Sequence, residues 1–141
     1  MKQINQKGFT LIELLVVIAV LGVLAAALVS AINPTSKINA AKDSNAKSDL
    51  SQVVNAAQAY VTNSANNSLY PAGSADFTVA GGELKTFPAT ITYVANAGKT
   101  AAAAYALSAV DATKYICWDS TLSAIKTTTT TAPTATTPTC N

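Results

Sequence analysis

The sequence lacks the residues on which most enzyme active sites depend. It has no histidine, and only two cysteines, Cys117 and Cys140, occur among its 141 residues. Without histidine, neither a Ser-His-Asp triad nor a Cys-His pair can form, and most transition-metal sites lose their commonest ligand. We therefore expect a protein that is not an enzyme, with no catalytic residue, no metal site and no bound cofactor.

Charged residues are scarce as well. They make up 11% of the chain, and the nine lysines outnumber the seven acidic residues by only two. No cluster of lysines with interleaved aromatic residues is present, so the sequence predicts no specific nucleic-acid binding. Half of the residues are hydrophobic, and the length suits one small domain with an added apolar segment.

The N-terminal part contains a long apolar run, residues 14–32, which only Gly22 and Ser30 interrupt. As a helix it is ~28 Å long, close to the ~30 Å hydrocarbon core of a bilayer. Lys2 and Lys7 precede the run, which favours a cytoplasmic N-terminus. Three interpretations fit: a cleaved secretory signal, a single-pass anchor, and a helix that first anchors the chain and is later withdrawn for assembly.

The helical period continues beyond the apolar run, in residues 34–63, with a different composition. Pro34 removes a backbone donor and disfavours helical geometry at Asn33, so we expect one long helix, roughly residues 9–63, with a kink or short break there. Asp43 and Lys47 form an i,i+4 pair on the polar face. The stripe that predicts an amphipathic helix consists of Ala46, Leu50, Val53, Ala57, Tyr60 and Ser64, with Val54 and Val61 beside it.

The C-terminal half has the alternation typical of β-strands. Residues 88–96, 101–110 and 114–120 read as strands, residues 120–126 add a possible edge, and short turn signals separate them. Gaps of this length favour an antiparallel sheet, placed at about residues 77–126, with one face covered by the amphipathic helix. The expected fold class is therefore α+β.

The tail, residues 127–141, is almost entirely threonine, alanine and proline, with too little apolar bulk to form a core. A disulfide from Cys140 to Cys117 would hold it, and in the chain-entropy model it is worth roughly 3 to 4 kcal/mol. Two cysteines behind an export or membrane segment favour such a bond outside the cytoplasm. A pair of buried free thiols is the alternative.

The stretch "KGFTLIELLVVIAVLGVLAAALVSAINP" resembles the N-terminus of bacterial type IV prepilins and of the pseudopilins of type II secretion and competence. The matching parts are a short lysine-bearing leader that ends in Gly8, the aromatic Phe9, Thr10-Leu11-Ile12, Glu13, and an aliphatic run that contains Gly22. The resemblance implies a pilin-like organisation. It comprises a leader (1–8), a transmembrane and assembly half of the helix (9–33), and a head (34–141) that contains the amphipathic half (34–63), the sheet and the disulfide-pinned tail.

The resemblance also implies how the N-terminus is processed. A membrane prepilin peptidase would cut between Gly8 and Phe9 on the cytoplasmic side and methylate the new amine of Phe9. Glycine fits such a cut because a protease subsite with no room for a Cβ accepts glycine alone.

For Glu13 the resemblance implies a role in filament assembly. In a bundle of apolar helices a carboxylate requires a partner, and the implied partner is the freed amine of Phe9 in the same or a neighbouring subunit. Such a pair would set the register of the helices. Without the surrounding motif, an acid six residues after Lys7 could equally rest at the cytoplasmic membrane interface.

Gly22 and Pro34 are candidates for helix flexibility. Glycine weakens a helix by about 1 kcal/mol relative to alanine and proline removes a hydrogen bond, so the stretch between them could unwind when the subunit leaves the bilayer. In the alternative, Gly22 only permits close helix packing.

The resemblance implies a structural subunit that polymerises with itself into a pilus-like filament for adhesion, motility or DNA uptake. Its implied partners are the prepilin peptidase and an inner-membrane assembly machinery with a motor ATPase. The precursor would lie in the inner membrane and the filament outside the cell. The alternatives are a pseudopilin and, from a different class, a membrane-tethered binding domain that never polymerises.

Overall fold

The computed structural model describes residues 8–78, 83–122 and 124–140, so the predicted leader, apart from Gly8, lies outside the described residues. The chain divides into two compact units, Met1–Lys37 and Ile38–Asn141. Helix α1 (Leu11–Ile32) belongs to the first, and most of helix α2 (Pro34–Thr62) and a four-stranded sheet belong to the second. The boundary between the two units lies after Lys37, within α2 and close to the predicted division at residue 33.

Helix α1 begins at Leu11, two residues later than the predicted start at Phe9. Thr10 has extended backbone angles (φ −80°, ψ 150°) and caps the helix, so it cannot itself be helical. No residue of α1 is buried. Within the described parts of the chain, only this helix is long and apolar enough to cross a membrane, with a mean hydropathy of 2.9.

The predicted break lies at Asn33, which separates α1 from α2. Asn33 has left-handed backbone angles (φ 46°, ψ 70°), because the ring of Pro34 disfavours the right-handed helical geometry and asparagine tolerates the left-handed one. The carbonyl of Asn33 accepts hydrogen bonds from the N–H groups of Ser36 (3.2 Å) and Lys37 (3.5 Å) and so starts α2. The predicted long helix with a short break is therefore confirmed, and the break is the single residue Asn33 between α1 and α2.

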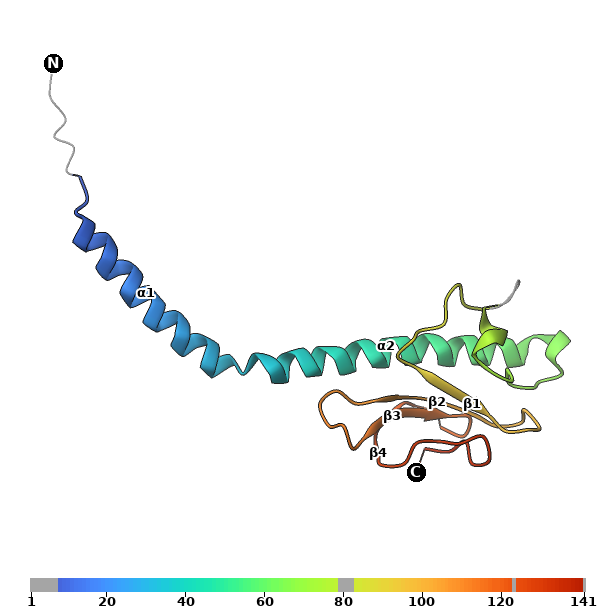
Figure 1. Cartoon of the computed structure of the whole chain (residues 1–141). Helices are drawn as coiled ribbons and strands as arrows, with labels where there is room; N and C mark the ends of the chain where they lie inside the picture. Colours follow the sequence, from blue (N-terminus) through green and yellow to red (C-terminus); the bar gives the residue numbers. More distant parts are fainter. Residues whose placement is uncertain (1–7, 79–82, 123, 141) are drawn as a thin grey trace, which may run out of the picture. The chain divides into compact units, whose positions relative to one another are not determined.

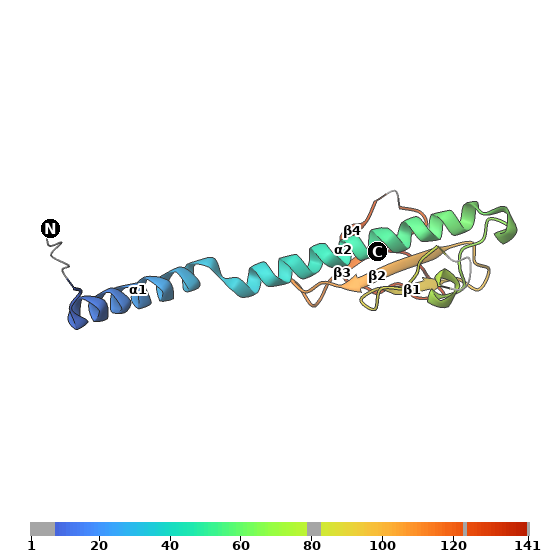
Figure 2. The ribbon, with the colours of Figure 1, turned by 90° about the horizontal axis from the view of Figure 1, so that it is seen from above.

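The sheet has four antiparallel strands in the order of the chain: β1 (Thr92–Ala95), β2 (Ala102–Leu107), β3 (Tyr115–Asp119) and β4 (Lys126–Thr129). Tyr93 lies opposite Ala104, which in turn lies opposite Trp118. Helix α2 runs along one face of the sheet, and the C-terminal segment lies on the other (Figures 1 and 2). Two short 3-10 helices, η1 (Ser64–Asn66) and η2 (Ser74–Phe77), connect α2 to the sheet.

The core lies between α2 and the sheet. The predicted stripe of α2 supplies it, since Leu50, Val53 and Ala57 are fully buried. The facing strands contribute small side chains in β2 and large ones in β3, where Ile116 and Trp118 are almost completely buried. The remaining buried members of this core are Ala46, Val54, Ala56, Phe77, Ile91, Tyr93, Ala102, Ala104 and Ala106.

The described strands span residues 92–129 rather than the predicted 77–126. At the start, Phe77 ends η2, where the carboxylate of Asp76 accepts the N–H of Ala72 (2.6 Å) and closes a turn instead of a strand. At the end, the carboxylate of Asp119 accepts the N–H of Thr121 and turns the chain at the predicted edge. The strand resumes as β4, which extends three residues into the segment assigned to the tail.

Asp43 has a different partner from the one predicted on α2. Its carboxylate accepts the hydroxyl of Ser108 (2.6 Å) and the N–H of Ala109 (2.5 Å), both just after β2. The expected pair with Lys47 is therefore replaced by a link to the sheet. Side-chain spacing alone favoured the local pair, whereas the fold brings donors 65 residues away to the carboxylate.

Candidate processing and assembly site

The N-terminal site is built by the first turn of α1. Glu13 Oε2 accepts hydrogen bonds from the backbone N–H of Thr10 (2.9 Å) and from its hydroxyl (2.8 Å), and Thr10 Oγ1 accepts the N–H of Glu13 (3.3 Å). This reciprocal arrangement is a capping box, which satisfies donors that would otherwise have no partner at a helix start. The acid also lies in the first turn, where a negative charge stabilises the helix dipole.

The predicted cleavage position lies directly before this capping box. Gly8 and Phe9 are exposed, and the side chain of Phe9 is 87% exposed. An added Cβ at Gly8 would meet nothing within 4 Å, so nothing in the described residues requires glycine at that position. The pair is accessible to an enzyme, and its cleavage and the methylation of Phe9 stay predictions.

Glu13 lies close to the predicted new N-terminus, because its carboxylate binds Thr10, the residue that follows Phe9. In the uncleaved chain Phe9 carries an amide, which has no positive charge. Cleavage after Gly8 would convert this amide into an amine one residue away from the Thr10 N–H that Glu13 already binds. The predicted pair of Glu13 with that amine is therefore compatible with the local geometry and stays a prediction.

The outer surface of α1 is the second part of the site. Its large aliphatic side chains are more than half exposed at most positions, and none is buried. Three of these residues, together with Ala19, line a shallow, almost purely apolar hollow of about 320 Å³: Val20, Val23 and Leu24. Such a surface is stable only against lipid tails or against other apolar helices.

Gly22 lies within this surface, in an uninterrupted helix. An added Cβ at Gly22 would meet nothing within 4 Å, so packing within the described chain does not explain the glycine. Pro34 is the first residue of α2, where its missing N–H costs no intrahelical hydrogen bond. Both predicted flexibility residues thus occupy places where the helix tolerates them, and the predicted unwinding between them stays untested.

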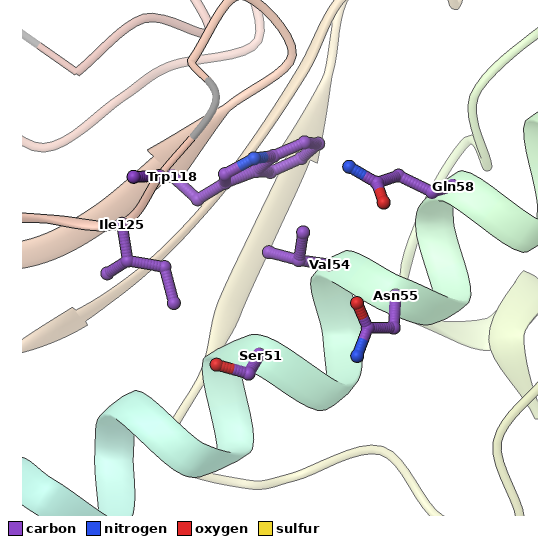
Figure 3. Close-up of a pocket in the computed structure, with 7 residues that line it drawn as sticks. Ser51, Val54, Asn55, Gln58, Trp118 and Ile125 are labelled. Atoms are coloured by element: carbon purple, nitrogen blue, oxygen red, sulfur yellow. The ribbon is translucent and has the colours of Figure 1, made fainter.

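A groove of about 260 Å³ lies between α2 and the end of β3, within the second unit. Figure 3 shows the indole of Trp118 and the side chain of Ile125 on the sheet side, and Ser51, Asn55 and Gln58 on α2. The residues that line it carry no titratable side chain, so this groove offers neither an acid nor a base. Among the described residues, no group of three or more acidic or cysteine side chains is placed to hold a metal ion.

The predicted disulfide is confirmed. Cys117 on β3 and Cys140 in the tail are bonded, with their Cα atoms 5.9 Å apart, and both are almost completely buried. The tail is thereby held against the sheet, although its composition could not form a core by itself. Of the predicted site residues, these two form a contact between segments that are distant in the sequence.

For two residues at these sites, the sequence alone gave no structural role. Thr10 could have been found, because Thr10-Leu11-Ile12-Glu13 fits the capping-box pattern of a threonine three residues before a glutamate. Asp119 binds the backbone of Cys140, and no local pattern relates two residues that are 21 positions apart. Only the fold shows that contact.

Comparison with known families gives one match. Residues 4–29 match the family described as the prokaryotic N-terminal methylation motif. The matched segment covers the predicted cleavage position, the capping box and most of α1. No curated protein and no solved structure gives a significant match to this chain.

Proposed function

We propose that this chain, which carries the type IV prepilin signature at residues 4–29, is a structural subunit of an extracellular pilus-like filament. The motif and the apolar helix α1 fit a membrane-anchored precursor of the pilin and pseudopilin kind. The finer claim, that the mature chain polymerises with itself into a filament for adhesion, motility or DNA uptake, is the proposal. The subunit has no enzymatic activity in this proposal.

One observation carries the proposal: the methylation motif opens a helix whose apolar surface is exposed on every side. Helix α1 has no buried residue, whereas the second unit has its own core between α2 and the sheet. The second unit therefore needs no help from α1 to bury its apolar side chains. This division suits a helix that passes from one apolar environment, the bilayer, into another, a bundle of identical helices.

In the proposed sequence of events, a prepilin peptidase cuts between Gly8 and Phe9 and methylates the new amine. An inner-membrane assembly machinery with a motor ATPase then moves the subunit into the growing filament. The amine of Phe9 becomes a cation beside Glu13, and the two charges compensate each other where apolar helices exclude water. Each joining subunit would thereby find one register along α1.

The direct test is the chemistry of the mature N-terminus. Mass spectrometry of the protein from sheared cell-surface material should give a chain that begins at Phe9 and carries one added methyl group. A chain that begins at Met1, or one cut after Ala27 as a secretory signal would be, contradicts the proposal. Expression without the peptidase should leave the leader attached and the protein in the membrane.

Electron microscopy separates the filament from the two alternatives. A pilus subunit should yield long filaments in the sheared fraction that antibodies against the second unit decorate. A methylated chain that stays in the inner membrane and forms only short assemblies on overexpression indicates a pseudopilin. A chain that is neither cut nor assembled indicates a tethered binding domain.

A further inference from the structure

The face of the sheet opposite α2 carries a buried carboxylate beside the disulfide. Alternate residues of a strand point to opposite faces, and Ile116 and Trp118 of β3 pack in the core with α2. Cys117 and Asp119 therefore point to the other face, where the C-terminal segment lies (Figure 1). Asp119 is only 2% exposed, so this charged residue is about as deeply buried as the two cysteines.

The carboxylate of Asp119 has three described donors. Oδ1 accepts the N–H of Thr121 (2.8 Å) and its hydroxyl (2.5 Å), while Oδ2 accepts the backbone N–H of Cys140 (2.8 Å). Burial alone would raise the pKa of Asp119, but these hydrogen bonds outweigh it and the pKa is lowered. The ammonium group of Lys126 adds a longer hydrogen bond to the Cys140 carbonyl (3.4 Å).

The contact to Cys140 has a consequence for the formation of the disulfide. The two cysteines are 23 positions apart, and the tail between them is rich in threonine and alanine. Bringing the two ends of a loop of this length together costs chain entropy. Without a contact that holds the tail, the two thiols therefore meet rarely. The hydrogen bond to Asp119 holds the backbone of Cys140 beside Asp119. Asp119 follows Cys117 by two residues on β3, so their Cα atoms are ~6.6 Å apart along the strand.

We propose that Asp119 is a positioning residue for the Cys117–Cys140 disulfide, whose buried carboxylate binds the backbone N–H of Cys140 and holds its thiol beside that of Cys117 before the bond forms. The oxidant is an external disulfide. One cysteine thiolate attacks it and forms a mixed disulfide, and the second thiolate then displaces the remaining half. The two cysteine thiols lose two protons and two electrons, and the external disulfide is reduced to two thiols.

The first test needs no variant. The ¹⁵N-labelled full-length chain in detergent micelles is reduced, and amide hydrogen exchange is followed by NMR. We expect the Cys140 N–H to exchange at least about tenfold more slowly than an unprotected amide, because a hydrogen bond to a buried carboxylate persists without the disulfide. The N–H of Ala135, for which the described residues provide no hydrogen bond, should exchange at the unprotected rate and serves as the reference.

An unprotected Cys140 amide in the reduced chain overturns the proposal, whether or not the sheet amides stay protected. A reduced chain that does not fold gives the same unprotected amide and has the same meaning. The result therefore depends on no substitution that could unfold the protein.

The second test measures the effective concentration of the two thiols against oxidised and reduced glutathione. Asp119→Asn keeps the size of the side chain, removes its charge and leaves one oxygen for three donors, so we expect about a tenfold decrease. Thr121→Val is the matched control, because it removes a donor to the same carboxylate and leaves the bond to Cys140 in place. For this variant we expect a change of less than about threefold.

Equal effective concentrations in the wild type and Asp119→Asn overturn the proposal. So does an equal decrease in both variants, because the effect would then come from a general loosening of the turn after β3. These measurements concern the closure of the tail alone, and they stay valid whether or not the chain forms a filament.

Discussion

Glu13 and Thr10 close the first turn of α1 on each other. Glu13 Oε2 lies 2.9 Å from the backbone nitrogen of Thr10 and 2.8 Å from its hydroxyl oxygen. The acid in the apolar segment is therefore already bound in the uncleaved chain, by the residue next to the predicted new N-terminus. Its role as a helix cap and its proposed role as the partner of the Phe9 amine use the same carboxylate, and substitutions can separate the two roles.

Glu13→Gln should strongly reduce filament assembly while the helix still inserts into the membrane. Glutamine at this position can complete a capping box, so the helix start is preserved, but the side chain carries no charge to pair with the amine of Phe9. We expect filament yield in sheared material, scored by electron microscopy, to fall by about tenfold or more, as the loss of a charged hydrogen bond requires. The amount of membrane-bound precursor should be unchanged.

Thr10→Ala is the matched control for the charge. It removes the capping hydroxyl at a cost of about 1 kcal/mol to the helix start but leaves the carboxylate of Glu13 in place. Filaments should therefore persist. If Thr10→Ala loses filaments and Glu13→Gln keeps them, the cap rather than the charge matters for assembly, and the register argument is wrong.

Asp43→Ala should destabilise the second unit. The carboxylate bridges α2 to the residues after β2 through Ser108 and Ala109, and a hydrogen bond to a charged group is worth about 2 kcal/mol. We expect a loss of about 2 kcal/mol in the free energy of unfolding, measured by urea titration with the fluorescence of Trp118. Asp49→Ala removes a single hydrogen bond from Thr90 that is exposed to solvent, so water can replace it and the cost should be less than about 1 kcal/mol. If both variants lose the same free energy of unfolding, the contact of Asp43 with Ser108 and Ala109 stabilises the second unit no more than the single bond of Asp49.

The sequence predicted the parts of this fold that depend on local pattern. The stripe of α2, the break at Pro34 and three of the four strands follow from helical period, proline chemistry and alternation. The observed strand boundaries differ from the predicted ones where a carboxylate accepts a backbone N–H and forms a turn. Asp76 and Asp119 both do this. The alternation of apolar and polar residues carries no information about such bonds, because in that pattern an acidic residue counts only as a polar one.

The same distinction applies to the candidate site. Gly8, Phe9 and Glu13 could be identified because their motif is contiguous. Thr10 was named as part of that motif without its capping role, although the capping pattern is visible in the sequence. The partners of Asp43 and Asp119 lie 65 and 21 positions away. No single sequence without the fold brings these groups together.

The second unit should lose stability in acid but not near neutral pH. The hydroxyl of Thr113 and the ammonium of Lys114, with the N–H of Thr113, lower the pKa of Asp111 to about 2, and hydrogen bonds lower that of Asp119. Unfolded aspartates titrate near pH 3.9, so the stabilisation is complete above that pH and is lost as the pH falls toward the folded pKa values. The chain has no histidine, so we expect the free energy of unfolding to be nearly constant between about pH 5 and pH 7.

Urea titrations at successive pH values measure this dependence. The midpoint should begin to fall below about pH 4 and continue to fall toward about pH 2, the folded pKa of Asp111. Asp111→Asn should flatten part of the slope, because the unfolded chain then has one group fewer that binds protons. An unchanged slope in this variant would mean that other carboxylates dominate the acid response.

Alkaline pH should destabilise the second unit through Tyr93. Burial of Tyr93, aided by the nearby Tyr70, Asp76 and Tyr60, raises the pKa of its phenol, whose hydroxyl donates to the carbonyl of Pro71 (3.3 Å). A tyrosine in the unfolded chain ionises near pH 10, so stability is present below that pH and decreases above it. Tyr93→Phe should cost about 1 kcal/mol at pH 7 but weaken the decrease above pH 10. Parallel curves for the two proteins would contradict this assignment.

Pro34→Ala should let α1 and α2 join as one continuous helix. Asn33 is left-handed because the proline ring disfavours right-handed helical geometry at the preceding residue, and alanine removes that restriction. The left-handed conformation costs a residue other than glycine roughly 1 to 2 kcal/mol, so Asn33 should change to helical angles once it is free to do so. The ¹³Cα and ¹³Cβ chemical shifts of Asn33 in micelles should move to helical values.

Asn33→Gly is the control for the break, because glycine adopts left-handed angles without steric cost and the proline stays in place. Its residue 33 should keep the left-handed conformation, and α2 should still begin at Pro34. If Pro34→Ala leaves the shifts of Asn33 unchanged, the break is set by something other than the proline ring. If the shifts change and filaments still form, the break is not required for assembly, and any unwinding during assembly must begin elsewhere, for which Gly22 is the remaining candidate.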